Sequence, residues 1–85
     1  MSERAYILIN SLEGKASEII KALDKQPGVV TIDHVDGLPD IIIIIEENDR
    51  LKLARLGITL FNSIGNLTAD IQCLPVNHEM RYTTV

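Results

Sequence analysis

Five consecutive isoleucines, at positions 41–45, constrain the fold of this chain more than any other feature. Asp40 precedes them, and Glu46 and Glu47 follow. Because successive side chains of a strand point to opposite faces of its sheet, a strand built from this run is apolar on both faces. The helices of an 85-residue chain can cover one sheet face, but little chain remains for the other. The run therefore predicts a central strand whose far face is covered by a partner.

Apolar patterns predict three further strands and two helices. The predicted strands are residues 4–12, 29–35 and 67–74, and the predicted helices are residues 15–25 and about 49–63. The apolar stripe of the first helix is Ala16, Ile19, Ile20 and Leu23, and that of the second is Leu51, Ala54, Ile58 and Phe61, widened by Leu53, Gly57 and Leu60. Asn48 or Asp49 is expected to cap the second helix. Gly57 costs that helix about 1 kcal/mol relative to alanine, which indicates close packing against another backbone.

The element order is βαββαβ, the ferredoxin-like arrangement of the α+β class. We expect a four-stranded antiparallel sheet in the order 4-1-3-2, since the first and third strands are apolar on both faces. The second strand, where Val30 and Ile32 share one face, and the fourth alternate with polar residues, as suits sheet edges. Asp36-Gly37 predicts a hairpin between the second and third strands. Right-handed crossovers place both helices on one face, in a single domain of residues 1–76 with a tail of residues 77–85.

The uncovered sheet face predicts a homodimer. Burying one isoleucine contributes about 1.5–3 kcal/mol. Three exposed isoleucines would forfeit roughly 5–9 kcal/mol, which is comparable with the whole stability of a small domain. The simplest partner is a second copy packed sheet to sheet. Its predicted interface residues are Ile41, Ile42, Ile43, Ile44 and Ile45. In an alternative model, residues 76–85 cover part of this face.

Composition narrows the class of protein. The net charge is −4 and basic residues are scattered, whereas a nucleic-acid surface needs clustered ones, so no direct nucleic-acid partner is expected. No apolar run is long enough to span a membrane, and the N-terminus lacks the features of a secretory signal, so a cytoplasmic protein is expected. Cys73 is the single cysteine; it excludes an internal disulfide and is interpreted as a small buried hydrophobe.

Residues with catalytic or metal-binding chemistry form no recognisable constellation. His34 lies near Asp33 and Asp36, but this spacing is not that of a metal site, so a solvent-facing histidine is expected. His78-Glu79 is read as a solvated pair in the tail. The sequence has no nucleophile elbow, phosphate-binding glycine loop or Cys-x-x-Cys motif. We therefore expect no cofactor, no metal and no enzymatic activity.

The turn formed by residues 36–40 is the strongest candidate for a binding function. Gly37 permits unusual backbone angles, and Asp40 lies at the start of the isoleucine strand, beside the predicted interface. Backbone N–H groups and a carboxylate at this place could hold the amino and carboxyl groups of a small zwitterion. The same residues also fit a simple hairpin turn with a polar start.

Residues 4–76 resemble the effector-binding (RAM) domain of the Lrp/AsnC family of feast/famine regulators. The motifs that carry the resemblance are Ala5-Tyr6-Ile7-Leu8-Ile9, Glu13-Gly14-Lys15, Pro27-Gly28-Val29, Gly37-Leu38-Pro39-Asp40, Ile64-Gly65-Asn66-Leu67 and Asp70-Ile71-Gln72-Cys73. Pro39 stands where the family has tyrosine, and Asp70 and Gln72 stand where it often has threonine. These departures imply a different ligand or a lost site.

The resemblance implies a regulatory module that senses an amino acid or related metabolite. Domains of this family form sheet-to-sheet dimers, often assembled into rings, and bind amino acids at clefts between subunits. The implied ligand-binding residues are Gly37, Leu38, Pro39, Asp40, Asp70 and Gln72. Full-length members also carry a DNA-binding helix-turn-helix, so this chain looks like a stand-alone form that could pair with full-length regulators.

Three alternatives remain open. The chain is also similar to the NapD chaperones, which bind a twin-arginine signal peptide; Pro27-Gly28 and residues 65–69 fit that family, and a monomer would be expected. An ACT-type amino-acid sensor has the same topology. The chain could also be an assembly subunit that has lost ligand binding.

Overall fold

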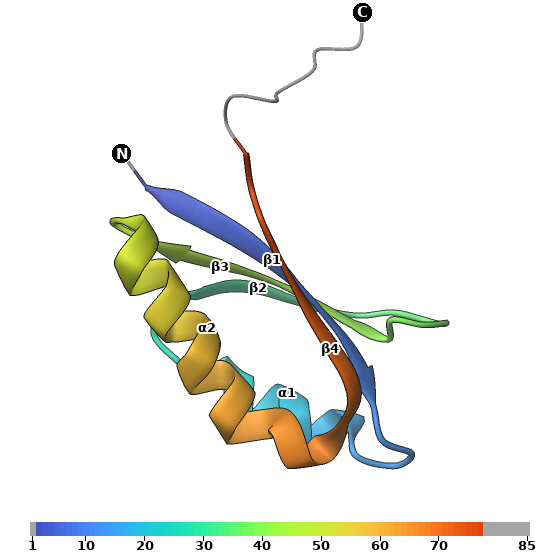
Figure 1. Cartoon of the computed structure of the whole chain (residues 1–85). Helices are drawn as coiled ribbons and strands as arrows, with labels where there is room; N and C mark the ends of the chain where they lie inside the picture. The colour runs from blue at the N-terminus through green and yellow to red at the C-terminus, as the bar shows by residue number, and fades with distance from the viewer. Residues whose placement is uncertain (1, 78–85) are drawn as a thin grey trace, which may run out of the picture.

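The predicted elements are all present in the computed structural model, which describes residues 2–77 (Figure 1). In chain order they are β1 (Glu3–Ser11), α1 (Ala16–Asp24), β2 (Val29–His34), β3 (Ile41–Glu47), α2 (Arg50–Ile64), the short 3₁₀ helix η1 (Gly65–Leu67) and β4 (Thr68–Pro75). Asp49 caps α2, because its Oδ1 accepts a hydrogen bond from the Lys52 N–H at 2.8 Å. The predicted tail from residue 78 onward lies outside the described residues.

The sheet is antiparallel with the strand order β2-β3-β1-β4, which confirms the ferredoxin-like topology. Strands β3 and β1 are central, as their apolar residues on both faces predict. Figure 1 shows α1 and α2 on one side of the sheet, with no helix on the other. We call the side without helices the open face.

Alternation along the central strands divides the isoleucine run between two environments. Ile41, Ile43 and Ile45 are fully buried under the helices, beside Ile7 and Ile9 of β1. These three isoleucines have no exposed surface left for a partner, so the predicted five-residue interface is wrong for them. Strand geometry instead points Ile42 and Ile44, which are half-buried, to the open face.

Helix α2 covers the sheet with a stripe that matches the predicted one in part, because Leu53 and Leu60 lie in the core as expected. Its core residues are Leu53, Leu56, Leu60 and Ile64, whereas Leu51 and Ile58 are 62% and 60% exposed. At 3.6 residues per turn, the apolar residues of α2 cover about 220° of its circumference, so the pattern alone fits more than one orientation. The prediction of close backbone packing at Gly57 is also wrong, because a Cβ there would meet no atom within 4 Å.

Two short segments depart from the regular pattern. The pairing of β2 with β3 shifts between Val29 and Thr31, so Val29 and Ile32 pack against the core while Val30 is exposed. The predicted face for Val30 is therefore wrong, since a bulge changes the alternation after it. The second segment is the C-terminal end of α2. Glycine and asparagine often end a helix in the left-handed conformation, but Gly65 has ordinary helical angles and α2 continues directly into η1.

Candidate functional site

The open face carries an apolar strip on three of its four strands, β3, β1 and β4. In the sheet register, Tyr6 pairs with Ile44 on one side and Leu74 on the other. One step along β1, Leu8 pairs with Ile42 and Gln72. Tyr6 and Leu74 are 44% and 43% exposed, so the strip is accessible in the single subunit.

Polar side chains border this strip. At one end, the Arg4 guanidinium forms an ion pair with Glu46 on the neighbouring strand. On the β2 side, Asp33 pairs with Ile42. At the other end of β4, Asp70 pairs with Asn10. A flat apolar centre with a polar border is the usual anatomy of a protein–protein interface.

Asp40 fastens the start of β3 to the end of β1. Its Oδ1 accepts a hydrogen bond from the Ser11 N–H at 2.9 Å, and its Oδ2 accepts one from the Ser11 hydroxyl. Its own N–H donates to the Ile9 carbonyl at 3.0 Å. Desolvation raises the pKa of Asp40, but the hydrogen bonds from Ser11 outweigh it and leave the pKa below its ordinary value. The Asp40 carboxylate, predicted to bind a ligand, thus already holds two protein donors.

The hairpin turn before Asp40 projects from the sheet (Figure 1). Gly37 has φ +110°, a conformation that favours glycine, and Leu38 is 77% exposed at the tip. The peptide bond between Leu38 and Pro39 is cis. The neighbouring His34 is exposed, as predicted.

The predicted ligand-binding residues lie at the same end of the sheet but do not converge within one subunit. Strand β1 separates Asp40, just before β3, from Asp70 and Gln72 on β4. Two strand spacings place these residues about 10 Å apart. Asp70 and Gln72 are exposed and point to the open face. One small amino acid therefore cannot contact all of them unless another subunit completes the site.

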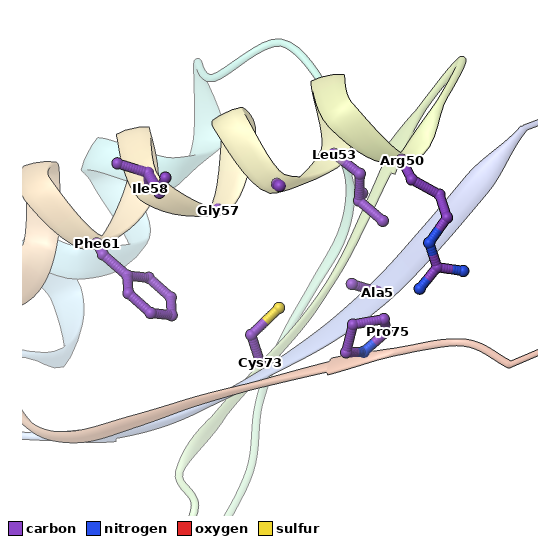
Figure 2. Close-up of a pocket in the computed structure, with 9 residues that line it drawn as sticks. Ala5, Arg50, Leu53, Gly57, Ile58, Phe61, Cys73 and Pro75 are labelled. Atoms are coloured by element: carbon purple, nitrogen blue, oxygen red, sulfur yellow. The ribbon is translucent and has the colours of Figure 1, made fainter.

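A second candidate site, which the sequence did not predict, lies on the helix side of the sheet. It is a cavity of about 260 Å³ between α2 and strands β1 and β4 (Figure 2). Its lining residues are Ala5, Arg50, Leu53, Ala54, Gly57, Ile58, Phe61, Cys73 and Pro75. The sequence signal for it is the stripe Ala54, Ile58 and Phe61, which the prediction assigned to the core; all three border this cavity, and Phe61 also packs against the core.

Cys73 lies in the wall of the cavity, and Figure 2 shows its sulfur pointing toward α2. Its side chain is partly buried, and burial raises the pKa of its thiol. The thiol is therefore neutral at physiological pH and contributes an apolar surface, in agreement with its interpretation as a small hydrophobe.

Within residues 2–77, no group of three or more His, Cys, Asp or Glu side chains is placed to hold a metal ion. No helix in the same range has the length and apolarity needed to span a membrane. No protein-family model matches the sequence, and a search of curated proteins finds no significant match.

Solved structures give a clear match in fold. PH0061 superposes with a TM-score of 0.81 at 16% identity, over 99% of this chain and 57% of PH0061. FFRP-DM1 superposes with a TM-score of 0.73 at 25% identity, over 88% of this chain and 99% of FFRP-DM1. A transcriptional regulator from Neisseria meningitidis, NMB0573 in complex with L-Met, gives a TM-score of 0.72 at 20% identity, over 96% of this chain and 54% of the regulator. The chain thus spans a little over half of PH0061 and NMB0573. E. coli AsnC superposes with a TM-score of 0.72 at 16% identity, over 98% of this chain and 56% of AsnC.

The same fold also occurs outside regulators. A putative antibiotic biosynthesis monooxygenase from Nitrosomonas europaea reaches a TM-score of 0.65 at 10% identity, over 93% of this chain and 91% of that protein. The regulators are the more similar of the two groups, and the resemblance that the sequence motifs indicate is confirmed in structure: the chain has the ferredoxin-like fold of the Lrp/AsnC effector-binding domain.

Proposed function

We propose that this chain is an effector-binding module of the Lrp/AsnC type, which pairs through its open face and senses an amino acid or a related small metabolite. The observation that carries the proposal is the accessible apolar strip of the open face, defined above by Tyr6, Leu8, Ile42, Ile44 and Leu74. The fold shared with AsnC and with the regulator bound to L-Met supports a regulatory role rather than an enzymatic one. The module acts in the cytoplasm, where such a regulator would meet its metabolite.

Pairing through the open face follows from the area that it leaves accessible. Tyr6 and Leu74 are each more than two-fifths exposed, and Leu8, Ile42 and Ile44 retain smaller exposed fractions. Covering the exposed parts of these five side chains would contribute about 2–6 kcal/mol per subunit, since full burial of one contributes about 1.5–3 kcal/mol. A second copy offers the same flat strip with the same polar border, so in a two-fold dimer each subunit covers the apolar strip of the other.

The ligand site of this model lies at the hairpin end of the sheet, between subunits. Leu38 and the backbone of Gly37 and Pro39 project far enough to reach another subunit, as the exposure of Leu38 suggests. Asp70 and Gln72 supply exposed polar groups from β4. Asp40 shapes the site by holding the hairpin against β1, and it keeps a negative charge near the amino group of the ligand.

The proposal is tested by combining oligomer size with a ligand screen. Light scattering should give a dimer or a multiple of it, and at least one amino acid should raise the melting temperature and release heat in calorimetry. Asp70→Ala and Gln72→Ala should abolish that response without changing the oligomer. Asp24→Ala, an exposed carboxylate at the end of α1, serves as the matched control and should leave the response intact.

Each contrary result has a distinct meaning. A monomer at all concentrations would refute the paired module and favour a chaperone that binds an extended peptide along a sheet edge. A dimer that responds to no amino acid would remove the sensing role and favour an assembly subunit that associates with full-length regulators.

A further inference from the structure

The cavity beneath α2 is separate from the open face and from the hairpin. It lies on the helix side of the sheet, between α2 and the strands β1 and β4 (Figure 2). Its volume of about 260 Å³ is just below the range of about 300–1,000 Å³ typical for drug-sized ligands. The cavity is therefore large enough for a small organic molecule.

The residues that line the cavity are apolar except for one charged residue at its end, as in many ligand-binding sites. Leu53, Ala54, Phe61 and Pro75 provide apolar surface, and Gly57 leaves room because no side chain fills the space above it. A cavity of this kind is normally lined by apolar groups and a few placed polar ones that orient the ligand.

The single charged group in the lining is the Arg50 guanidinium. Figure 2 shows it extending from the first turn of α2 toward β1, at the end of the cavity near Ala5 and Pro75. Arg50 Nη1 lies 3.4 Å from Glu3 Oε1, a long contact in which the Arg50 side chain is 67% exposed and that of Glu3 is 17% exposed. A guanidinium has five N–H donors, so it can bind a further carboxylate in place of this contact.

From these features we propose that the cavity binds a small carboxylic acid with an apolar body, whose carboxylate pairs with Arg50 and whose body lies against Phe61 and Cys73. A free amino acid fits less well, because no lining residue carries a carboxylate to accept the hydrogen bonds of an ammonium group, and the Glu3 carboxylate beside Arg50 lies outside the lining. This site is independent of the proposed amino-acid site at the hairpin.

The single cysteine of the chain gives a direct reporter for this site. Cys73 is the one thiol in the sequence and lines the cavity, so alkylation by N-ethylmaleimide reads the access to the cavity alone. A molecule that occupies the cavity must slow this reaction, whereas a ligand bound at the open face or at the hairpin leaves it unchanged.

The test uses sodium octanoate, below its micellar concentration, on the full chain. Octanoate should raise the melting temperature and slow alkylation of Cys73 about tenfold or more at saturation. Arg50→Gln should weaken binding about tenfold, as loss of a charge-assisted hydrogen bond does. Arg55→Gln removes the same charge from an exposed position of the same helix that does not line the cavity, and should bind as the parent does. 1-Octanol and L-methionine should bind at least tenfold more weakly than octanoate.

A cavity-filling variant separates this site from any other. Gly57→Leu should keep the fold, since a Cβ at residue 57 meets no atom within 4 Å, and should abolish both effects of octanoate. Circular dichroism checks the fold, and Gly57→Ala provides a smaller step if the leucine disturbs it. The proposal is overturned if octanoate leaves Cys73 alkylation unchanged, if Gly57→Leu binds octanoate as tightly as the parent, or if Arg50→Gln and Arg55→Gln bind it equally.

Discussion

Adjacent isoleucines of β3 should respond in opposite ways to the same substitution. Ile43→Asp places a carboxylate among fully buried side chains, and Ile44→Asp places one on the half-buried open face. The first change should unfold the subunit. The second should leave the subunit folded and dissociate the dimer.

The magnitudes follow from burial. At residue 43 the substitution forfeits about 1.5–3 kcal/mol of apolar burial and adds several kcal/mol for a buried unpaired polar group. That loss reaches the total of about 5–15 kcal/mol that stabilises a small domain. At residue 44 a single subunit loses about 1–3 kcal/mol of apolar burial, and the carboxylate reaches solvent because part of this position is exposed. A dimer would bury two introduced carboxylates at a cost of about 4 kcal/mol, which raises its dissociation constant roughly a thousandfold.

Sedimentation velocity and thermal melts followed by circular dichroism measure the two outcomes. The melting temperature of the parent should rise with protein concentration, and that of Ile44→Asp should not. Leu51→Asp is the matched control, since Leu51 is 62% exposed on α2, away from the open face, and its variant should remain a dimer. An Ile44→Asp protein that stays dimeric would refute the interface, and an Ile43→Asp protein that melts like the parent would refute the assignment of this side chain to the core.

Two further predictions concern stability. Gly57→Ala should raise the stability by about 1 kcal/mol and the melting temperature by about 4–8 °C, because α2 gains helix propensity and the added methyl meets no neighbour. Gly28→Ala should lower the melting temperature instead, because φ is +93° there and a Cβ would collide with Leu56 Cδ2; equal melts for the two variants would contradict both statements. The lowered pKa of Asp40 means that its stabilising contribution is fully present above its unfolded-state pKa of about 3.9 and is lost as the pH falls through the folded-state value. Urea unfolding of the parent and of Asp40→Asn between pH 7 and pH 2 should therefore show a smaller acid loss for Asn, and identical pH profiles would refute the role of the Ser11 hydrogen bonds.

The topology was predictable because it depends on period-two alternation and on the order of the elements. The isoleucine run and residues 5–9 require central positions, and the hairpin signal at Asp36-Gly37 joins β2 to β3. What could not be predicted depends on contacts between distant residues. The hydrogen bonds between Asp40 and Ser11 join residues 29 positions apart, so they cannot be predicted from a local sequence pattern.

The orientation of α2 was predicted only in part, for a related reason. Leu53 and Leu60 were expected in the core and lie there, but Leu51, Ala54 and Ile58 form an equally regular stripe, and only the position of the sheet beneath the helix decides between them. The bulge in β2 is similar: Val30 has the residue type of a core strand position, and the register of pairing with β3 alone turns it outward.

The chain carries more apolar surface than its own core uses, and it does so at two places of different shape. On the open face, the even-numbered isoleucines continue a flat strip bordered by charges of both signs, which suits another protein surface. Beneath α2, the surplus stripe of the helix surrounds a concave space with one guanidinium at its end, which suits a small acid.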